Sequence, residues 1–126
     1  MGILLDTHVL LWWLADDKRL GKEARRLIAD PSDTIFVSAA TAWEIVIKQA
    51  LGKLKFEGDL LDAQVDAQGF ERLPVHFKHA AAVGDLPPIH RDPFDRMLIA
   101  QARMENLRLL TADPDILGYP VNVLKA

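Results

Sequence analysis

Short apolar stretches without a polar face alternate with helix-forming segments along this chain. Residues 3–5, 34–37 and 107–110 are too short to be buried helices, and a polar residue follows each of them. Strands of this kind are typical of parallel sheets buried on both faces, and successive parallel strands are usually joined by a helix. The alternation therefore predicts an α/β fold in which a mostly parallel central sheet is flanked by helices on both faces.

The remaining segments complete this arrangement. Two more strands are expected at 73–75 and 120–124, and Pro74 places the first at an edge of the sheet because proline has no N–H to donate. Helices are expected at 9–14, 21–29, from after Ser38 to about Leu51, 59–68, 76–83 and 92–102. A length of 126 residues suits a single domain that spans 1–126.

Composition excludes several classes of site. The chain has no cysteine, which excludes disulfides, thiolate metal sites and cysteine nucleophiles. Its net charge of −3 argues against binding nucleic acid through bulk positive charge, although a carboxylate-rich site that recruits divalent cations would give the same balance. The sequence shows no signal-peptide pattern and no apolar stretch long enough to cross a bilayer, so we expect a cytoplasmic protein with no membrane partner.

The segment 92–102 is expected to be a buried helix with two carboxylates at its mouth. Asp92 suits the N-cap because its side chain can accept from the exposed N–H groups of the first turn, and Pro93 suits the first helical position. Asp95 then falls near the positive end of the helix dipole. The rest of the segment is mostly apolar on every side, which favours a place in the core.

Acidic residues occur where the expected strands end. Asp6 follows the first strand, Glu44 lies early in the helix after the second, and Asp113 lies two residues beyond Thr111 at the end of a later strand. Ligands of open parallel sheets bind beyond the carboxyl ends of the strands. The sequence therefore predicts that these acids gather with those of the 92–102 helix at one edge of the sheet.

Such a cluster suggests a hard divalent cation. Carboxylates brought together without cations repel each other, and the sequence offers neither a cysteine nor a lysine expected among them. Mg²⁺, or Mn²⁺ as a substitute, prefers oxygen ligands and suits phosphoryl chemistry. If the acids converge, Asp95→Asn relieves their repulsion and is expected to raise the stability of the metal-free protein.

Each acid also has a simpler explanation that involves no ligand. Asp6 suits a cap for the following helix, and Asp113 before Pro114 suits a turn. Thr41 and Glu44 have the spacing of a capping box, in which the two side chains bond reciprocally to backbone N–H groups at a helix start. Taken singly these explanations compete well, but they do not explain why the acids coincide with strand ends.

Four segments resemble the PIN domain, and more specifically the VapC-type ribonuclease toxins of toxin–antitoxin systems. They are 4–8 (LLDTH), 37–45 (VSAATAWEI), 92–102 (DPFDRMLIAQA) and 109–113 (LLTAD), in the family's order across essentially the whole chain. The resemblance implies a PIN-like fold and four acids that are both catalytic and metal-binding: Asp6, Glu44, Asp95 and Asp113. Asp95 is preferred to Asp92 because it directly precedes the apolar pattern of the helix. Supporting residues beside the acids are Thr7, Ser38, Asp92, Thr111 and Asp115, the last as a weaker substitute for Asp113.

The same resemblance implies an activity and partners. It implies a Mg²⁺-dependent endoribonuclease that hydrolyses RNA phosphodiesters with a metal-activated water and leaves a 5′-phosphate and a 3′-hydroxyl. It also implies a cognate antitoxin protein as partner. The residues expected to hold RNA are Lys48, Lys53, Lys55, Arg91 and Arg96. Trp12, Trp13 and Trp43 are expected in the core, and the apolar helix around the first two is a candidate interface for a homodimer.

Other proteins also place acids and Mg²⁺ at strand ends. A phospho-acceptor domain resembling a response regulator needs an aspartate at the end of a middle strand, whereas the second expected strand ends in Ser38. A phosphatase resembling the haloacid dehalogenases needs a second aspartate two residues after the first, and that position is His8. The alternative to a nuclease is therefore a catalytically inactive or phospho-acceptor-like α/β binding module.

Overall fold

The computed structural model describes residues 2–56, 60–89 and 92–126. Within these residues a five-stranded sheet has the order β3-β2-β1-β4-β5, and every pairing is parallel. The strands are β1 (Ile3–Leu5), β2 (Ile35–Ser38), β3 (Glu71–Leu73), β4 (Arg108–Thr111) and β5 (Val123–Lys125). The predicted α/β fold is confirmed, and the first strand of the chain lies in the middle of the sheet.

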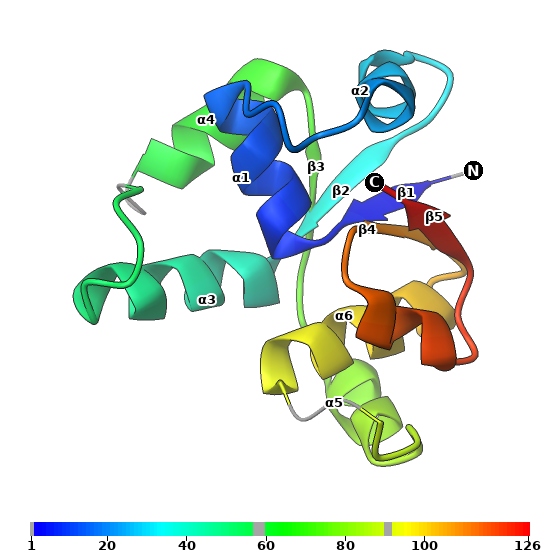
Figure 1. Cartoon of the computed structure of the whole chain (residues 1–126). Helices are drawn as coiled ribbons and strands as arrows, with labels where there is room; N and C mark the ends of the chain where they lie inside the picture. The colour runs from blue at the N-terminus through cyan, green and yellow to red at the C-terminus, as the bar shows by residue number, and fades with distance from the viewer. Residues whose placement is uncertain (1, 57–59, 90–91) are drawn as a thin grey trace.

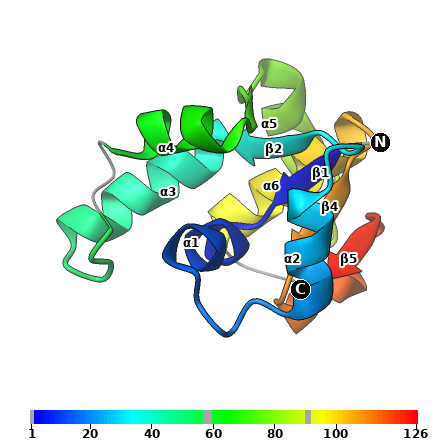
Figure 2. The ribbon, with the colours of Figure 1, turned by 90° about the horizontal axis from the view of Figure 1, so that it is seen from above.

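Both faces of the sheet are covered, because successive strand residues point to opposite sides. Ile3 and Leu5 pack into one core with α1 (Thr7–Ala15), α2 (Lys22–Ala29) and α4 (Leu61–Gln68). Leu4 packs into a second core with α5 (Phe77–Val83) and α6 (Pro93–Met104). Figure 1 shows the first group of helices above the strands and the second group below them. Seen from above, α3 (Ala39–Ala50) and α4 extend from the sheet on the side opposite β5 (Figure 2).

Helices begin directly after the central strands. Asp6 is the N-cap of α1, Ser38 is the N-cap of α3, and Asp113 caps the 3₁₀ helix η2 (Pro114–Gly118). Asp92 caps α6, with Pro93 in its first turn, as the sequence predicts. The first turns of α1, α3 and α6 consequently lie near one another at the carboxyl edge of the sheet (Figure 1).

Two predicted strands are shifted along the sequence. The strand expected at 73–75 is β3 at Glu71–Leu73, and that expected at 120–124 is β5 at Val123–Lys125. Pro74 follows β3 directly, so the proline ends this strand instead of lying within it. The predicted edge position of β3 is confirmed, since it pairs only with β2. The expected helix start at Asp59 lies outside the described residues, and α4 begins at Leu61.

The prediction that all three tryptophans lie in the core is wrong. Trp43 is 63% exposed and packs edge-on against Phe94 on α6, with ring centroids 5.1 Å apart. Trp12 and Trp13 are half-buried on α1. Glu44 is the buried neighbour of Trp43, and successive helix residues point in directions about 100° apart, which turns Trp43 outward. In the part of the chain described, no helix combines the length and apolar character needed to cross a bilayer.

Candidate active site at the carboxyl edge of the sheet

Asp6 is a buried carboxylate at the end of β1, with only 3% of the residue exposed. The backbone N–H of Thr7 donates to its Oδ1 at 2.7 Å, and the hydroxyl of Thr111, at the end of β4, donates to its Oδ2 at 2.7 Å. Burial raises the pKa of the Asp6 carboxyl, and these hydrogen bonds oppose that effect only in part. Asp6 therefore combines a fixed orientation with a charge that burial disfavours, which suits a cation ligand.

Glu44 is the second buried carboxylate and comes from α3. The hydroxyl of Thr7 donates to its Oε1 at 2.7 Å. Thr41 lies 3.1 Å from the same hydroxyl oxygen, and because Thr7 uses its hydrogen for Glu44, Thr41 is the donor in that contact. Neighbouring charge from Glu44 contributes to the raised pKa of Asp6, so the two carboxylates lie within electrostatic reach of one another. Thr7 thus joins β1 to α3 between the two acids.

Lys48 contradicts the expectation that no lysine lies among the acids. Its Nζ is 2.5 Å from Oε2 of Glu44, one helical turn away on α3. Burial lowers the pKa of Lys48, but the contact with Glu44 and the charges of Asp92 and Asp95 outweigh it and raise the pKa above its ordinary value. The spacing of four residues puts both side chains on one face of the helix, so the pair was open to prediction.

Asp92 and Asp95 enter the site from the first turn of α6. Asp92 is committed to its cap, where Oδ1 accepts from the N–H groups of Phe94 at 2.9 Å and Asp95 at 3.2 Å. Asp95 is half-buried, and both acids attract Lys48 electrostatically. Asp92 is therefore the cap of α6, and the preference for Asp95 as the catalytic acid stays a prediction.

Asp113 is connected to Asp6 through Thr111. The N–H of Asp113 donates to the Thr111 hydroxyl at 3.0 Å, and that hydroxyl donates in turn to Asp6. The Asp113 side chain caps η2 by accepting from the N–H of Asp115 at 2.9 Å. Asp115 itself is exposed. The simpler explanation of Asp6 as a helix cap is therefore correct, and Asp113, which was expected in a turn, caps a 3₁₀ helix. The capping box is wrong because Ser38 is the cap of α3.

In the described part of the chain, hydrogen bonds and charges connect neighbouring acids, but the acids do not form a complete set of metal ligands. Among the described residues, no group of three or more His, Asp or Glu side chains is placed to hold a metal ion. Threonine hydroxyls and Lys48 stand between the carboxylates instead. The donor chemistry nevertheless fits Mg²⁺ or Mn²⁺, because Asp6 and Glu44 present buried carboxylate oxygens beside hydroxyls.

The other predicted residues have separate roles. Ser38 accepts from the N–H of Ala40 and donates to Oε1 of Gln101 at 2.5 Å, which ties the start of α3 to α6. The Arg96 guanidinium donates to the backbone carbonyls of Pro87 and Val83 and lies 3.2 Å from the Tyr119 hydroxyl. It anchors the loop before α6. Lys53 and Lys55 are exposed, and Arg91 lies outside the described residues.

Sequence reasoning missed two buried polar residues near the acids. Thr41 was considered only as part of a capping box, although its hydroxyl contacts Thr7. Gln101 was treated as part of the apolar helix, yet it is fully buried, accepts from Ser38 and donates to the carbonyl of Pro74 at 3.1 Å. A polar residue within an otherwise apolar buried helix was the available signal, because such groups need partners.

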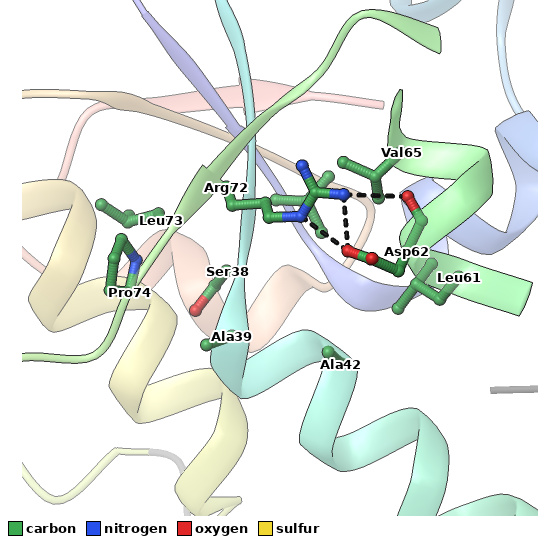
Figure 3. A pocket seen from close by; sticks show the side chains of 10 residues that line it. Ser38, Ala39, Ala42, Leu61, Asp62, Val65, Arg72, Leu73 and Pro74 are labelled. Atoms are coloured by element: carbon green, nitrogen blue, oxygen red, sulfur yellow. Dashed lines mark hydrogen bonds and ion pairs between the residues drawn. The ribbon is translucent and has the colours of Figure 1, made fainter. Parts of the chain in front are cut away.

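A separate pocket of about 360 Å³ lies beside Ser38, between the start of α3, α4 and the edge strand β3. Figure 3 shows Arg72 over this pocket, paired with Asp62 from α4, with apolar side chains around it. None of the four acids lines the pocket. The candidate site is therefore defined by the buried carboxylates and their hydroxyl partners.

Comparison with known proteins gives matches over nearly the full chain. The family model described as PIN domain matches residues 3–121. Ribonuclease VapC22 of Mycobacterium tuberculosis is 29% identical over 113 residues, which cover 88% of this chain and 86% of that protein.

Solved structures are similar in fold. A chain of VapBC2 from Rickettsia felis, bound to a DNA fragment from its promoter, superposes with a TM-score of 0.74 at 17% identity and covers 99% of this chain and 98% of that one. A chain of DNA-bound VapBC from Salmonella typhimurium gives a TM-score of 0.71 at 17% identity, with the same coverage of 99% and 98%.

Proposed function

This chain belongs to the PIN-domain family, and from that premise we propose that it is a Mg²⁺-dependent endoribonuclease, the toxin of a type II toxin–antitoxin pair that acts in the cytoplasm. The observation that carries the proposal is the pair of buried carboxylates, Asp6 and Glu44, joined through Thr7 at the carboxyl edge of the sheet. The name of the relative, Ribonuclease VapC22, supports RNA as the substrate.

The four acids have distinct parts in this proposal. Asp6 and Glu44 hold a divalent cation, with Asp95 and Asp113 as the remaining ligands at the mouth of the site. When bound, Mg²⁺ or Mn²⁺ supplies a water of lowered pKa as nucleophile and neutralises charge on the attacked phosphate. Thr7 and Thr111 fix the directions of the Glu44 and Asp6 oxygens, so that the ligands are oriented before the cation arrives. Lys48, Lys53, Lys55 and Arg91 are proposed to contact the RNA backbone, and Arg96 supports the loop beside them.

A cleavage assay tests the nuclease. Purified protein free of any antitoxin is incubated with a mixed RNA pool in Mg²⁺ and in EDTA, beside Asp6→Asn and Glu44→Gln. Glu23→Gln is the matched control, because that exposed carboxylate pairs with Arg26 on α2. We expect cleavage in Mg²⁺ by the wild type and the control only, with 5′-phosphate ends. Equal cleavage by Asp6→Asn, or none by the wild type on any RNA, would favour the inactive or phospho-acceptor-like binding module instead.

An antitoxin is proposed as the protein partner, because the structural neighbours include VapBC complexes and one described as a toxin–antitoxin complex from Klebsiella pneumoniae. Co-expression with the protein encoded beside this chain, followed by purification on one tag, tests for a stable complex. Recovery of this chain alone, at full expression of both, contradicts the pairing.

We also propose a homodimer, but through a different surface from the helix around Trp12. The ring of Trp13 contacts Phe70 and its Nε1 donates to Gln68 of α4 at 3.0 Å, so this side chain already has partners. Some of the exposed apolar side chains form instead an apolar patch made of Trp43, Val75 and Phe77, with Val46 about one helical turn from Trp43 on α3. Phe77→Asp, at a side chain 96% exposed, is expected to convert a dimer to a folded monomer in sedimentation experiments. An unchanged dimer mass would place the interface elsewhere.

A further inference from the structure

We propose that Lys48 is the resident counter-ion of the metal-free site and competes directly with the divalent cation for Glu44. This inference rests on the cation site proposed above. It assigns Lys48 a positioning role in the site, in addition to any contact with RNA. When a divalent cation binds, it replaces the ammonium of Lys48 as the positive charge beside Glu44.

Both oxygens of Glu44 are occupied in the structure. Oε1 accepts from the Thr7 hydroxyl at 2.7 Å, and Oε2 accepts from Nζ of Lys48 at 2.5 Å. The Glu44 side chain is only 3% exposed, compared with 69% for Asp66 in its ion pair with Arg72. A buried carboxylate without a counter-charge is costly, so the contact with Lys48 stabilises the metal-free fold in a way that an exposed pair does not.

Of the two partners, Lys48 is the one that is able to leave. Thr7 is buried, lies in the first turn of α1 and is held by Thr41 as well as by Glu44. Lys48 is 34% exposed, and its four-carbon stem allows the ammonium to move towards water without any change in the backbone. A cation that approaches Glu44 therefore displaces Lys48 from Oε2 and leaves the Thr7 contact in place.

The surrounding charges extend the competition beyond Glu44. Asp92 and Asp95 also attract Lys48, so its ammonium lies among carboxylates contributed by both α3 and α6. No three of the described acidic or histidine side chains are placed to hold a metal ion in the structure in which Lys48 contacts Glu44. When the ammonium moves away it vacates Oε2 of Glu44, and the incoming cation takes over the neutralisation of the carboxylates that Lys48 provided.

Cation binding by the metal-free protein tests this role without any RNA. Mg²⁺ and Mn²⁺ are titrated by calorimetry into the wild type, Lys48→Met, Lys48→Arg and Lys22→Met, and the melting temperature of each protein is measured in EDTA. Lys22 is exposed at the start of α2, so Lys22→Met reproduces the loss of one positive charge away from the site. Lys48→Arg keeps the charge on a side chain of similar length.

We expect Lys48→Met to bind the cations about tenfold more tightly than Lys22→Met, the size of effect that loss of one charge-assisted contact gives. In EDTA the same variant is expected to melt below Lys22→Met, and Lys48→Arg is expected to behave as the wild type in both measurements. Equal cation affinity of Lys48→Met and Lys22→Met would overturn the competition and leave the nuclease proposal intact. Absence of binding in all four proteins would contradict the cation site itself, and with it both proposals.

Discussion

Two pairs of acidic residues at the carboxyl edge of the sheet are held by different kinds of contact. Asp6 and Glu44 are buried, and each is held by a hydroxyl from another element, over sequence separations of 105 and 37 residues. Asp92 and Asp113 are half-buried and accept from backbone N–H groups two or three residues away. Backbone contacts close in sequence hold the second pair, whereas the hydroxyl contacts of the first pair depend on the assembled sheet, although Asp6 also caps α1.

Although these acids lie at the same edge of the sheet, their different contacts predict different responses to substitution. A helix cap is satisfied by any side chain that offers a suitable oxygen, so asparagine replaces aspartate there at little cost. A buried carboxylate is maintained against the cost of burying its charge, and for this reason we propose Asp6 as a functional residue. Substitutions that remove charge but keep shape therefore distinguish Asp6 from the cap residue Asp92, whereas Asp113 is both a cap and a proposed cation ligand.

The largest effect is expected when Asp6 is compared with Asp92. Asp6→Asn is expected to lower RNA cleavage by at least about 100-fold, since a proposed cation ligand is lost. Asp92→Asn keeps a side chain of equal capping ability and is expected to remain within about a factor of three of the wild type. Initial cleavage rates in Mg²⁺ measure both. A loss at Asp92 as large as that at Asp6 would remove the distinction between the two groups.

A smaller loss is expected when the support of Asp6 is removed. Thr111→Val eliminates the hydroxyl that donates to Asp6 and accepts from the N–H of Asp113. We expect cleavage to fall by about 10- to 100-fold and the free energy of unfolding to fall by about 1–3 kcal/mol. Thr34→Val, at an exposed position before β2, is the matched control. If Thr111→Val cleaves as the control does, Asp6 does not depend on this hydroxyl.

Stability in EDTA is expected to respond in opposite ways at Asp6 and Asp95. The pKa of Asp6 is raised above its ordinary value of 3.8, so the folded protein binds more protons than the unfolded chain between 3.8 and the raised pKa. Ionisation of Asp6 therefore lowers stability as pH rises through that window. Asp6→Asn is expected to melt several degrees above the wild type at neutral pH, with a difference that shrinks below the window.

Asp95→Asn is expected to give no such increase. The sequence alone suggests that this substitution relieves repulsion, but Lys48 attracts Asp95 electrostatically, and this attraction opposes the repulsion. Melting curves at several pH values compare the two variants directly. A higher melting temperature for Asp95→Asn than for Asp6→Asn would show that repulsion is concentrated at α6 instead.

The smallest effect is expected at Asp115. This residue is exposed and contributes its backbone N–H, not its carboxylate, to the cap of η2. Asp115→Asn should leave both cleavage and melting temperature unchanged, while Asp113→Asn should reduce cleavage in the same assay. Equal losses from the two would mean that Asp115 substitutes for Asp113 as the fourth acid.

Much of the fold was predictable because its signals are local. Apolar stretches without a polar face gave the parallel sheet, and the Asp92–Pro93 pair marked the start of α6. Strand ends were less predictable where a proline was involved, since Pro74 is compatible with a place in an edge strand or just after one. These errors moved strands by a few residues and left the topology unaffected.

The candidate site was predictable as a set of positions but not as a set of contacts. Acids at strand ends indicated which edge to consider, because the carboxyl ends of parallel strands share an edge. The roles of Thr7 and Thr111 depend on which strands are neighbours in the sheet. Lys48 was read as an RNA contact, although its spacing from Glu44 also fits an ion pair within one helix. The further attraction of Lys48 to Asp92 and Asp95 was not predictable without the position of α6.

The central position of β1 has a consequence for how this protein is made. A ribosome releases residues 3–5 first, but their partner strand β4 begins only at Arg108, and Asp6 receives its hydroxyl donor from Thr111. β1 is able to pair with β2 once residues 35–38 have emerged, but its other edge stays unpaired until β4 has been made, so completion of the sheet waits for a contact distant in sequence. A growing polypeptide would carry no assembled site while it is still attached to the translation machinery. The proposed ability to bind a cation and cleave RNA would arise late, when β4 and β5 emerge and complete the sheet.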